Sequence, residues 1–293
     1  TGLPKIVIGA TIISLGTTLP EMFVSVMAAF MGNPGLALGN GVGSIIADTG
    51  LIFGLSCVLA AMPVNRYILN RTGWIQVGAA LLLVIISVIA LATRSPDSPP
   101  VLERWVGFFF LALLAGYLYI TYYWSKQKHG EENQTMDNEE TEARGLSLSW
   151  ILLIGGLILV IVGARLLVPG ASEIAERIGV PDDVIAASMV AFGTSLPELI
   201  TAITAIRKGH PEITVGNIVG ADVLNCLFVI GAAAAAVPLA IPQNFYSLHF
   251  PVMLLILLSF RVFISTNKSG YFSKWQGIWL LSIYAGYLVI QYT

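Results

Sequence analysis

Charged side chains are scarce in this chain. Only 11 % of its 293 residues are Asp, Glu, Lys or Arg, against roughly 25 % in soluble globular proteins. The formal net charge of -2 offers no basic surface for a nucleic-acid backbone. With 2 cysteines and 3 histidines, neither a disulfide framework nor a zinc or copper site is expected. These scarcities exclude a soluble enzyme, a disordered chain and a nucleic-acid binder.

Long apolar runs are abundant instead, and 56 % of the residues are hydrophobic. A helix needs roughly 20 mostly apolar residues to cross a bilayer. Nine segments meet this requirement, at residues 5–31, 36–62, 73–92, 105–124, 149–168, 180–207, 211–237, 247–265 and 272–291. We therefore predict an all-α, multi-pass integral protein of the lipid bilayer, located in the cell (plasma) membrane.

Residues 125–147 interrupt this pattern with acidic side chains and no apolar periodicity. We interpret them as a solvated, cytoplasmic linker between a first membrane repeat, 1–124, and a second, 148–293. Lys and Arg near span ends set orientation, because the cytoplasmic side carries their excess. They are concentrated in one set of alternating loops, at Lys5, Arg66, Arg71, Lys126, Lys128, Arg144, Arg207, Lys208, Arg261, Lys268 and Lys274. These loops are therefore predicted to face the cytoplasm.

One motif occurs twice in the chain. Gly16-Thr17-Thr18-Leu19-Pro20-Glu21 reappears as Gly193-Thr194-Ser195-Leu196-Pro197-Glu198. Gly39-Asn40 reappears as Gly216-Asn217 at the same separation. This separation is 177 residues, and we call it the repeat offset. A gapless match over two consecutive spans indicates internal duplication. Five crossings separate the two copies, so they are predicted to point in opposite directions. Such an inverted-topology repeat is typical of secondary transporters.

The two halves differ in their number of predicted spans. The second half has five spans, whereas the first has four and lacks a counterpart of the span 149–168. We therefore expect an inverted-topology repeat of two five-helix halves, with the first helix of the first half missing from this chain.

Four acidic residues fall inside the spans, namely Glu21, Asp48, Glu198 and Asp222. A charge at mid-depth costs about 2.5–3.5 kcal/mol, and no Lys or Arg lies deep in these spans. Bound cations, protons or water must therefore offset the charge. Hydroxyl and amide groups near the same depth come from Thr17, Thr18, Ser44, Thr194, Ser195 and Asn225. Hard cations such as Ca²⁺ take about 6–8 oxygen ligands of these kinds.

Pro20 and Pro197 precede the two motif glutamates. Proline removes a backbone donor and disrupts the helix one turn earlier, so both spans are predicted to break near Gly16 and Gly193. Broken helices expose backbone carbonyls at mid-membrane, which transporters use to bind cations.

Three further polar residues carry weaker expectations. Asn40 and Asn217 are expected either to support the backbone of a broken helix or to act as ligands. His249, near an outer span end, is expected to face solvent.

The duplicated G-[ST]-[ST]-x-P-E helix, followed by a G-N-x-x-G-[SA] helix, resembles the α-repeats of the calcium/cation antiporters, a superfamily that includes the sodium/calcium exchangers. The resemblance is close over residues 5–62 and 180–237. It implies exchange of cytoplasmic Ca²⁺ for external Na⁺ by alternating access, with no cofactor besides the transported ions. It also implies that Glu21 and Glu198 are the main Ca²⁺ ligands, and that the carbonyls of Ser14 and Ala191 contribute to flanking Na⁺ sites.

The chain departs from this pattern at three positions. The central polar pair is Asp48 and Asn225, whereas many sodium/calcium exchangers have Asn in the first repeat and Asp in the second. Ala221 replaces a serine, and Asp222 is an additional acid. These departures leave H⁺/Ca²⁺ exchange and K⁺-dependent Na⁺/Ca²⁺ exchange open as alternatives.

Two other classes are less favoured. A cation channel usually repeats its filter as a ring around a pore, which two antiparallel copies in one chain do not provide. A membrane enzyme is not expected, because no nucleophile–base pair appears. No obligate protein partner is inferred.

Overall fold

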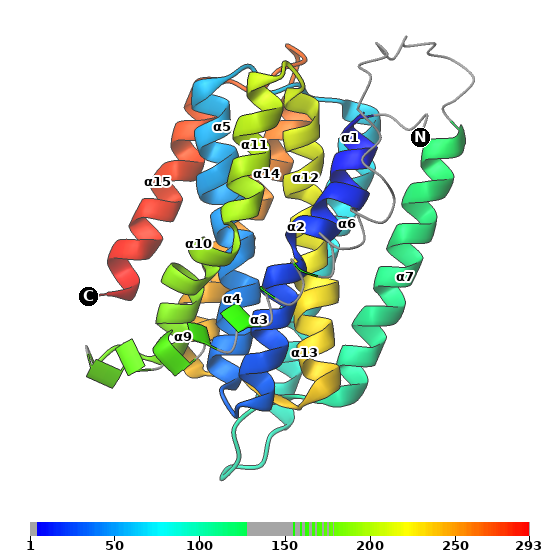
Figure 1. Cartoon of the computed structure of the whole chain (residues 1–293). Helices are drawn as coiled ribbons and strands as arrows, with labels where there is room; N and C mark the ends of the chain where they lie inside the picture. Colours follow the sequence, from blue (N-terminus) through cyan, green and yellow to red (C-terminus); the bar gives the residue numbers. More distant parts are fainter. Residues whose placement is uncertain are drawn as a thin grey trace.

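The computed structural model describes residues 5–127 and 179–292, and between them residues 155, 159, 162–163, 166–167, 169–171, 173–174 and 176–177. The described chain is a bundle of upright helices with short connections at both ends (Figure 1). The linker from residue 128 onward and most of the span 149–168 lie outside the described residues. The division into two five-helix halves joined by a linker therefore stays a prediction.

Five helices of the described chain are long and apolar enough to cross a membrane: Pro34–Leu59, Leu69–Thr93, Arg104–Trp124, Pro211–Ala236 and Phe245–Thr266. Two bent helix pairs raise the number to seven if each pair is one span. These seven correspond to seven of the nine predicted spans. The ninth predicted span, 272–291, forms the 18-residue helix α15 (Lys274–Gln291). This helix is not among the seven candidate membrane spans.

The two bent spans have the same construction. The first contains α1 (Lys5–Ile8), η1 (Gly9–Ile13), α2 (Ser14–Thr17) and α3 (Leu19–Phe30), and the second contains α9 (Asp182–Ile185), η4 (Ala186–Val190), α10 (Ala191–Thr194) and α11 (Leu196–Arg207). They bend by 45° and 40°, at Thr18 and Ser195. Pro20 and Pro197 lie in the first turn after each bend, where a missing N–H leaves no helical bond unmade. The break predicted from the prolines is confirmed.

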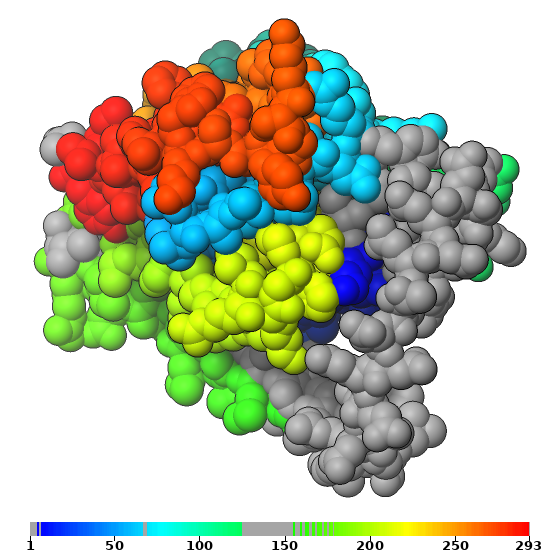
Figure 2. Space-filling view, turned by 90° about the horizontal axis from the view of Figure 1, so that it is seen from above, coloured from blue at the N-terminus to red at the C-terminus, as the bar shows by residue number. Residues whose placement is uncertain are grey.

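The bent spans run in opposite directions. Lys5 Nζ, at the start of the first span, lies 2.9 Å from His210 Nδ1, just after the end of the second. Asn33 Nδ2, after the end of the first span, donates to Asp182 Oδ2 at the start of the second, at 2.6 Å. Figure 2, seen from the upper end of Figure 1, shows the blue first helix beside the yellow helix α12.

Two further spans form the buried centre of the bundle. One comprises α4 (Pro34–Ile46), η2 (Ala47–Phe53) and α5 (Gly54–Leu59), and the other comprises α12 (Pro211–Leu224), η5 (Asn225–Ile230) and α13 (Gly231–Ala236). Each packs against the first half of one bent span. A Cβ on Gly43 would lie 2.5 Å from Ala187 Cα, and a Cβ on Gly220 would lie 2.6 Å from the Ala10 carbonyl. Glycine therefore permits both close approaches.

The remaining helices surround this centre. They are α6 (Arg66–Thr93), α7 (Arg104–Gln127) and α14 (Phe250–Thr266), which follows η6 (Phe245–His249). Large apolar side chains such as Ile85, Phe108 and Val262 are exposed on them, as expected for helices in contact with lipid. The strands β1 (Val101–Leu102) and β2 (Leu239–Ala240) pair antiparallel and join two loops at one end of the bundle.

Candidate cation site

The breaks in the two bent spans bring the two motifs together crosswise. Thr18 Oγ1 donates to Glu198 Oε1 at 3.5 Å, and Ser195 Oγ donates to Glu21 Oε1 at 3.4 Å. All four residues are buried. Since Thr18 matches Ser195 and Glu21 matches Glu198 at the repeat offset, the two contacts are equivalent. Each motif hydroxyl therefore faces the glutamate of the other repeat.

Several buried oxygens of the candidate residues have no hydrogen-bond partner among the described residues. They are Glu21 Oε2, Glu198 Oε2, Ser44 Oγ, Asp48 Oδ1, Asp222 Oδ1 and Asn225 Oδ1. Buried polar atoms are normally paired. Within the described chain, no ion pair involves any of these carboxylates. The set therefore offers acidic and neutral oxygens with no cationic side chain to neutralise them.

The four acidic residues interact electrostatically with one another. Glu21 lies near Glu198 and Asp48, and Asp48 lies near Asp222. Asp48 and Asn225, which match at the repeat offset, also meet directly, because Asn225 Nδ2 donates to Asp48 Oδ2 at 3.4 Å. Both lie at the start of a π-helical segment, η2 or η5, where the helix is locally widened.

The first hydroxyl of each motif also contacts an asparagine. Thr194 Oγ1 donates to Asn40 Oδ1 at 3.0 Å, and Thr17 Oγ1 donates to Asn217 Oδ1 at 3.4 Å. Asn40 Nδ2 donates in turn to the Glu21 carbonyl at 3.0 Å. This geometry fits the expected supporting role of Asn40, because its side chain ties the two broken helices together.

The backbone carbonyls implied by the family resemblance are already engaged. The Ser14 carbonyl accepts from Thr18 N–H at 2.9 Å and from Thr17 Oγ1 at 3.3 Å. The Ala191 carbonyl accepts from Ser195 N–H at 2.9 Å and from Thr194 Oγ1 at 3.2 Å. A cation at either carbonyl would have to displace or share a hydroxyl, and the implied role of Ser14 and Ala191 stays a prediction.

Asp222 has hydrogen-bond partners that could not be predicted from the sequence. Its Oδ2 accepts from Thr49 Oγ1 and, at 2.5 Å, from Gln76 Nε2 of α6. Gln76 is a single glutamine in an apolar span and belongs to no motif. A lone amide side chain within an apolar span was the one signal that the sequence offered.

The arrangement differs from a resident metal centre. The described chain contains no group of three or more His, Cys, Asp or Glu residues placed to hold a metal ion. A cation here would depend on carboxylates combined with hydroxyl and amide oxygens. Such mixed sets of oxygens suit hard cations.

His249 does not face solvent, so that expectation is wrong. Its side chain is fully buried, with Nδ1 2.7 Å from the Tyr287 hydroxyl and Nε2 3.2 Å from Asp183 Oδ2. The segment η6 places the ring between α9 and α15. Span hydropathy alone does not reveal which face of a helix is turned inward.

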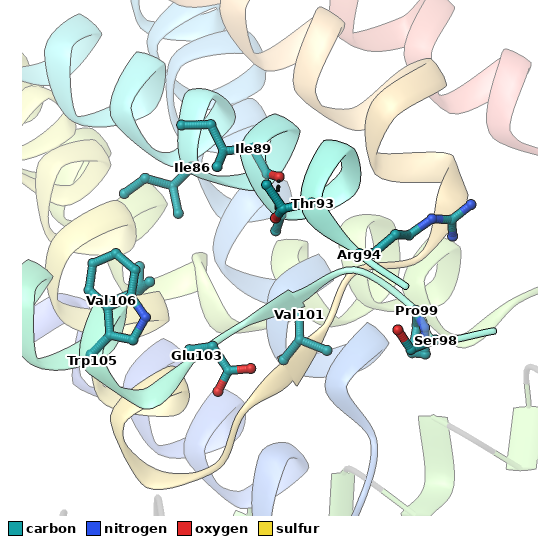
Figure 3. Close-up of a pocket in the computed structure, with 11 residues that line it drawn as sticks. Ile86, Ile89, Thr93, Arg94, Ser98, Pro99, Val101, Glu103, Trp105 and Val106 are labelled. Carbon is teal, nitrogen blue, oxygen red and sulfur yellow. Dashed lines mark hydrogen bonds between the residues drawn. The ribbon is translucent and has the colours of Figure 1, made fainter. Parts of the chain in front are cut away.

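A cavity of about 490 Å³ lies apart from these residues, where the end of α6 meets β1 and the start of α7 (Figure 3). Its lining includes Ile86, Arg94, Glu103 and Trp105. None of the predicted cation ligands lines it, so it is not the candidate cation site.

Comparisons with known proteins agree on one family. The family described as "Sodium/calcium exchanger protein" matches residues 1–123 and 148–293. The sodium/calcium exchanger MaX1 of Methanosarcina acetivorans is 30 % identical over 317 residues, covering 99 % of this chain and 90 % of MaX1. The inner membrane protein YrbG of Escherichia coli is 32 % identical, covering 89 % of this chain and 78 % of YrbG.

The fold agrees as well. A structure of the sodium-calcium exchanger NCX_Mj, soaked with 2.5 mM Na⁺ and 0.1 mM Ca²⁺, superposes with a TM-score of 0.67 and 29 % identity, covering 98 % of this chain and 87 % of that one. On this likeness, and on the family match over residues 1–123 and 148–293, the chain is a multi-pass integral membrane protein that belongs to the sodium/calcium exchanger family, whose members are transporters rather than enzymes.

Proposed function

We propose that this chain exchanges Na⁺ for Ca²⁺ across the cell membrane by alternating access to the buried site between the bent spans. One observation carries the proposal. Glu21 and Glu198 are fully buried, each faces a hydroxyl of the opposite repeat, and each has an oxygen with no partner among the described residues. The similarity to MaX1 and NCX_Mj supports the choice of ions.

In this proposal Ca²⁺ binds between Glu21 and Glu198. Two carboxylates match its double charge, and Thr18, Ser195 and Ser44 add neutral oxygens, which suits a hard cation. Na⁺ ions occupy the same carboxylates together with Asp48 and Asn225. Because both loads use the same negative charges, neither remains bound when the other is present. This competition couples the two fluxes.

The antiparallel packing supports access from both sides. The start of the first bent span packs on α12, and the start of the second packs on α4. These two contacts are equivalent at the repeat offset. A site between two equivalent, oppositely directed halves is equally suited to opening toward either side. The family resemblance also implies that the helix 149–168 slides to gate access. This stays a prediction, because most of that helix lies outside the described residues.

The test is uptake of ⁴⁵Ca²⁺ into proteoliposomes that contain the protein. Uptake should require an outward Na⁺ gradient, and Glu21→Gln or Glu198→Gln should abolish it. The matched control is Glu173→Gln, because Glu173 is an exposed glutamate paired only with Arg177 in the described chain. This control should transport normally.

Three results would contradict the proposal. Uptake driven by a pH gradient alone would replace it with H⁺/Ca²⁺ exchange. Uptake that stays normal in both glutamine variants would exclude the site. No Ca²⁺ uptake under Na⁺, K⁺ or pH gradients would exclude Ca²⁺ as the substrate.

A further inference from the structure

We propose that Asp222, Gln76 and Thr49 form a separate site for one monovalent alkali cation beside the two motif glutamates. The proposal deepens the exchange function proposed above and depends on it for its role in transport. All three side chains are at most 1 % exposed. Asp222 Oδ2 accepts hydrogen bonds from Thr49 Oγ1 and Gln76 Nε2. This leaves Asp222 Oδ1 and Gln76 Oε1 without a partner among the described residues.

The hydrogen bonds leave one oxygen of Asp222 open to a ligand. Both neighbours donate to the other oxygen, Oδ2. The second oxygen has no hydrogen-bond partner in the described chain, and no Lys, Arg or His forms an ion pair with Asp222 there. An ionised Asp222 would be a buried charge without a counterion, which is costly. A bound cation would neutralise it.

The composition of this group favours a monovalent ion. It contains one carboxylate, one amide carbonyl and one hydroxyl, and therefore a single negative charge. Ca²⁺ sites generally combine more than one carboxylate within about 6–8 oxygen ligands. One charge and neutral oxygens match Na⁺ or K⁺ instead.

The group breaks the internal symmetry of the chain. At the repeat offset, Asp222, Gln76 and Thr49 correspond to Ile45, Met253 and Cys226. Apolar side chains thus suffice at the equivalent place in the other repeat. The duplicated fold therefore does not need this polar group, and a bound ligand would account for it.

The position of Asp222 links the site to Ca²⁺ binding. Asp222 interacts electrostatically with Asp48 and Glu198. A cation at Asp222 adds positive charge next to the carboxylates that hold Ca²⁺. It is therefore expected to bind as part of the monovalent load and to weaken Ca²⁺ binding while it is present.

The experiment counts bound ions directly. Purified protein is equilibrated with ²²Na⁺, and separately with ⁸⁶Rb⁺ as a tracer for K⁺, and the ions bound per chain are measured at saturation. Asp222→Asn should bind one ion fewer than the unmodified chain, in the Na⁺ arm or in the K⁺ arm. Glu21→Gln should retain that ion. The arm that changes identifies the cation.

A second variant covers the case in which Asp222→Asn does not fold. Gln76→Met introduces the residue of the symmetry-related position and keeps the carboxylate. It should weaken the same ion while Ca²⁺ binding without monovalent ions persists. Equal ion counts and equal affinities in both variants would overturn the proposal. The two proposals can fail separately. Normal transport in Glu21→Gln and Glu198→Gln would refute the exchange site, whereas loss of one bound ion in Asp222→Asn would still support the monovalent site at Asp222.

Discussion

The motif hydroxyls contact glutamates and asparagines from both repeats. Thr18 and Ser195 donate to the glutamate of the opposite repeat. Thr17 and Thr194 interact with the same two glutamates and in addition donate to Asn217 and Asn40. The two adjacent hydroxyls of each motif therefore converge on one carboxylate.

Thr18→Ala and Ser195→Ala should weaken Ca²⁺ binding by similar amounts, because the two contacts are equivalent. Each variant removes one neutral oxygen from the proposed Ca²⁺ site, a loss comparable to that of one ordinary hydrogen bond, about 1 kcal/mol, or roughly fivefold in affinity. Titration of the purified variants with Ca²⁺ measures the effect. Ser282→Ala is the control, since Ser282 donates to the Ile278 carbonyl of its own helix, away from the site. A large effect in one variant and none in the other would contradict a symmetric site.

At the scale of elements, the central spans and the bent spans determine where the ligands lie. Gly43 and Gly220 allow the backbones of α4 and α12 to touch η4 and η1. The buried contacts of His249 with Asp183 and Tyr287 join η6 to α9 and α15 on one side. On the other side, the Tyr117 hydroxyl of α7 donates to the Ala10 carbonyl of η1 at 3.1 Å. The outer helices thus hold each bent span by different polar contacts.

Gly43→Ala and Gly220→Ala should both destabilise the protein, because the added methyl would lie within 2.6 Å of backbone atoms. Overpacking of this kind typically costs about 1–3 kcal/mol. Thermal unfolding in detergent, followed by fluorescence, should show lower midpoints for both variants. Gly78→Ala is the matched control, since nothing lies within 4 Å of its added Cβ. Midpoints equal to that of Gly78→Ala would show that the helices do not approach so closely.

At the scale of the whole molecule, loops that are distant in sequence meet at each end of the bundle. Lys5 contacts His210 at one end, where Pro63 also bridges to Tyr271. At the other end β1 pairs with β2, and Asn33 contacts Asp182. The first of these ends carries basic residues that sequence analysis assigns to the cytoplasmic side. The orientation in the membrane itself remains a prediction.

Cysteine labelling in intact cells tests this orientation. The background carries Cys57→Ala and Cys226→Ala, which removes two buried thiols. Asp97→Cys and Lys208→Cys then place one thiol at either end, both at exposed positions. A membrane-impermeant thiol reagent added outside should label Asp97→Cys and leave Lys208→Cys unlabelled until the membrane is permeabilised. The reverse pattern would place the basic loops outside.

The membrane class, the duplication and most of the candidate ligands could be predicted from the sequence. Hydropathy needs only local composition, and a repeat at a fixed offset is visible without coordinates. The prolines beside Glu21 and Glu198 also predicted the helix breaks, because proline acts on its own turn of helix.

Which side chains meet was settled by the packing of the helices in three dimensions. The crosswise pairing of hydroxyls and glutamates, the contact of Gln76 with Asp222, and the burial of His249 all join residues of different spans. Such contacts depend on how helices pack and rotate about their axes. The hydrophobic periodicity of one span does not show which residues of a neighbouring span lie opposite it.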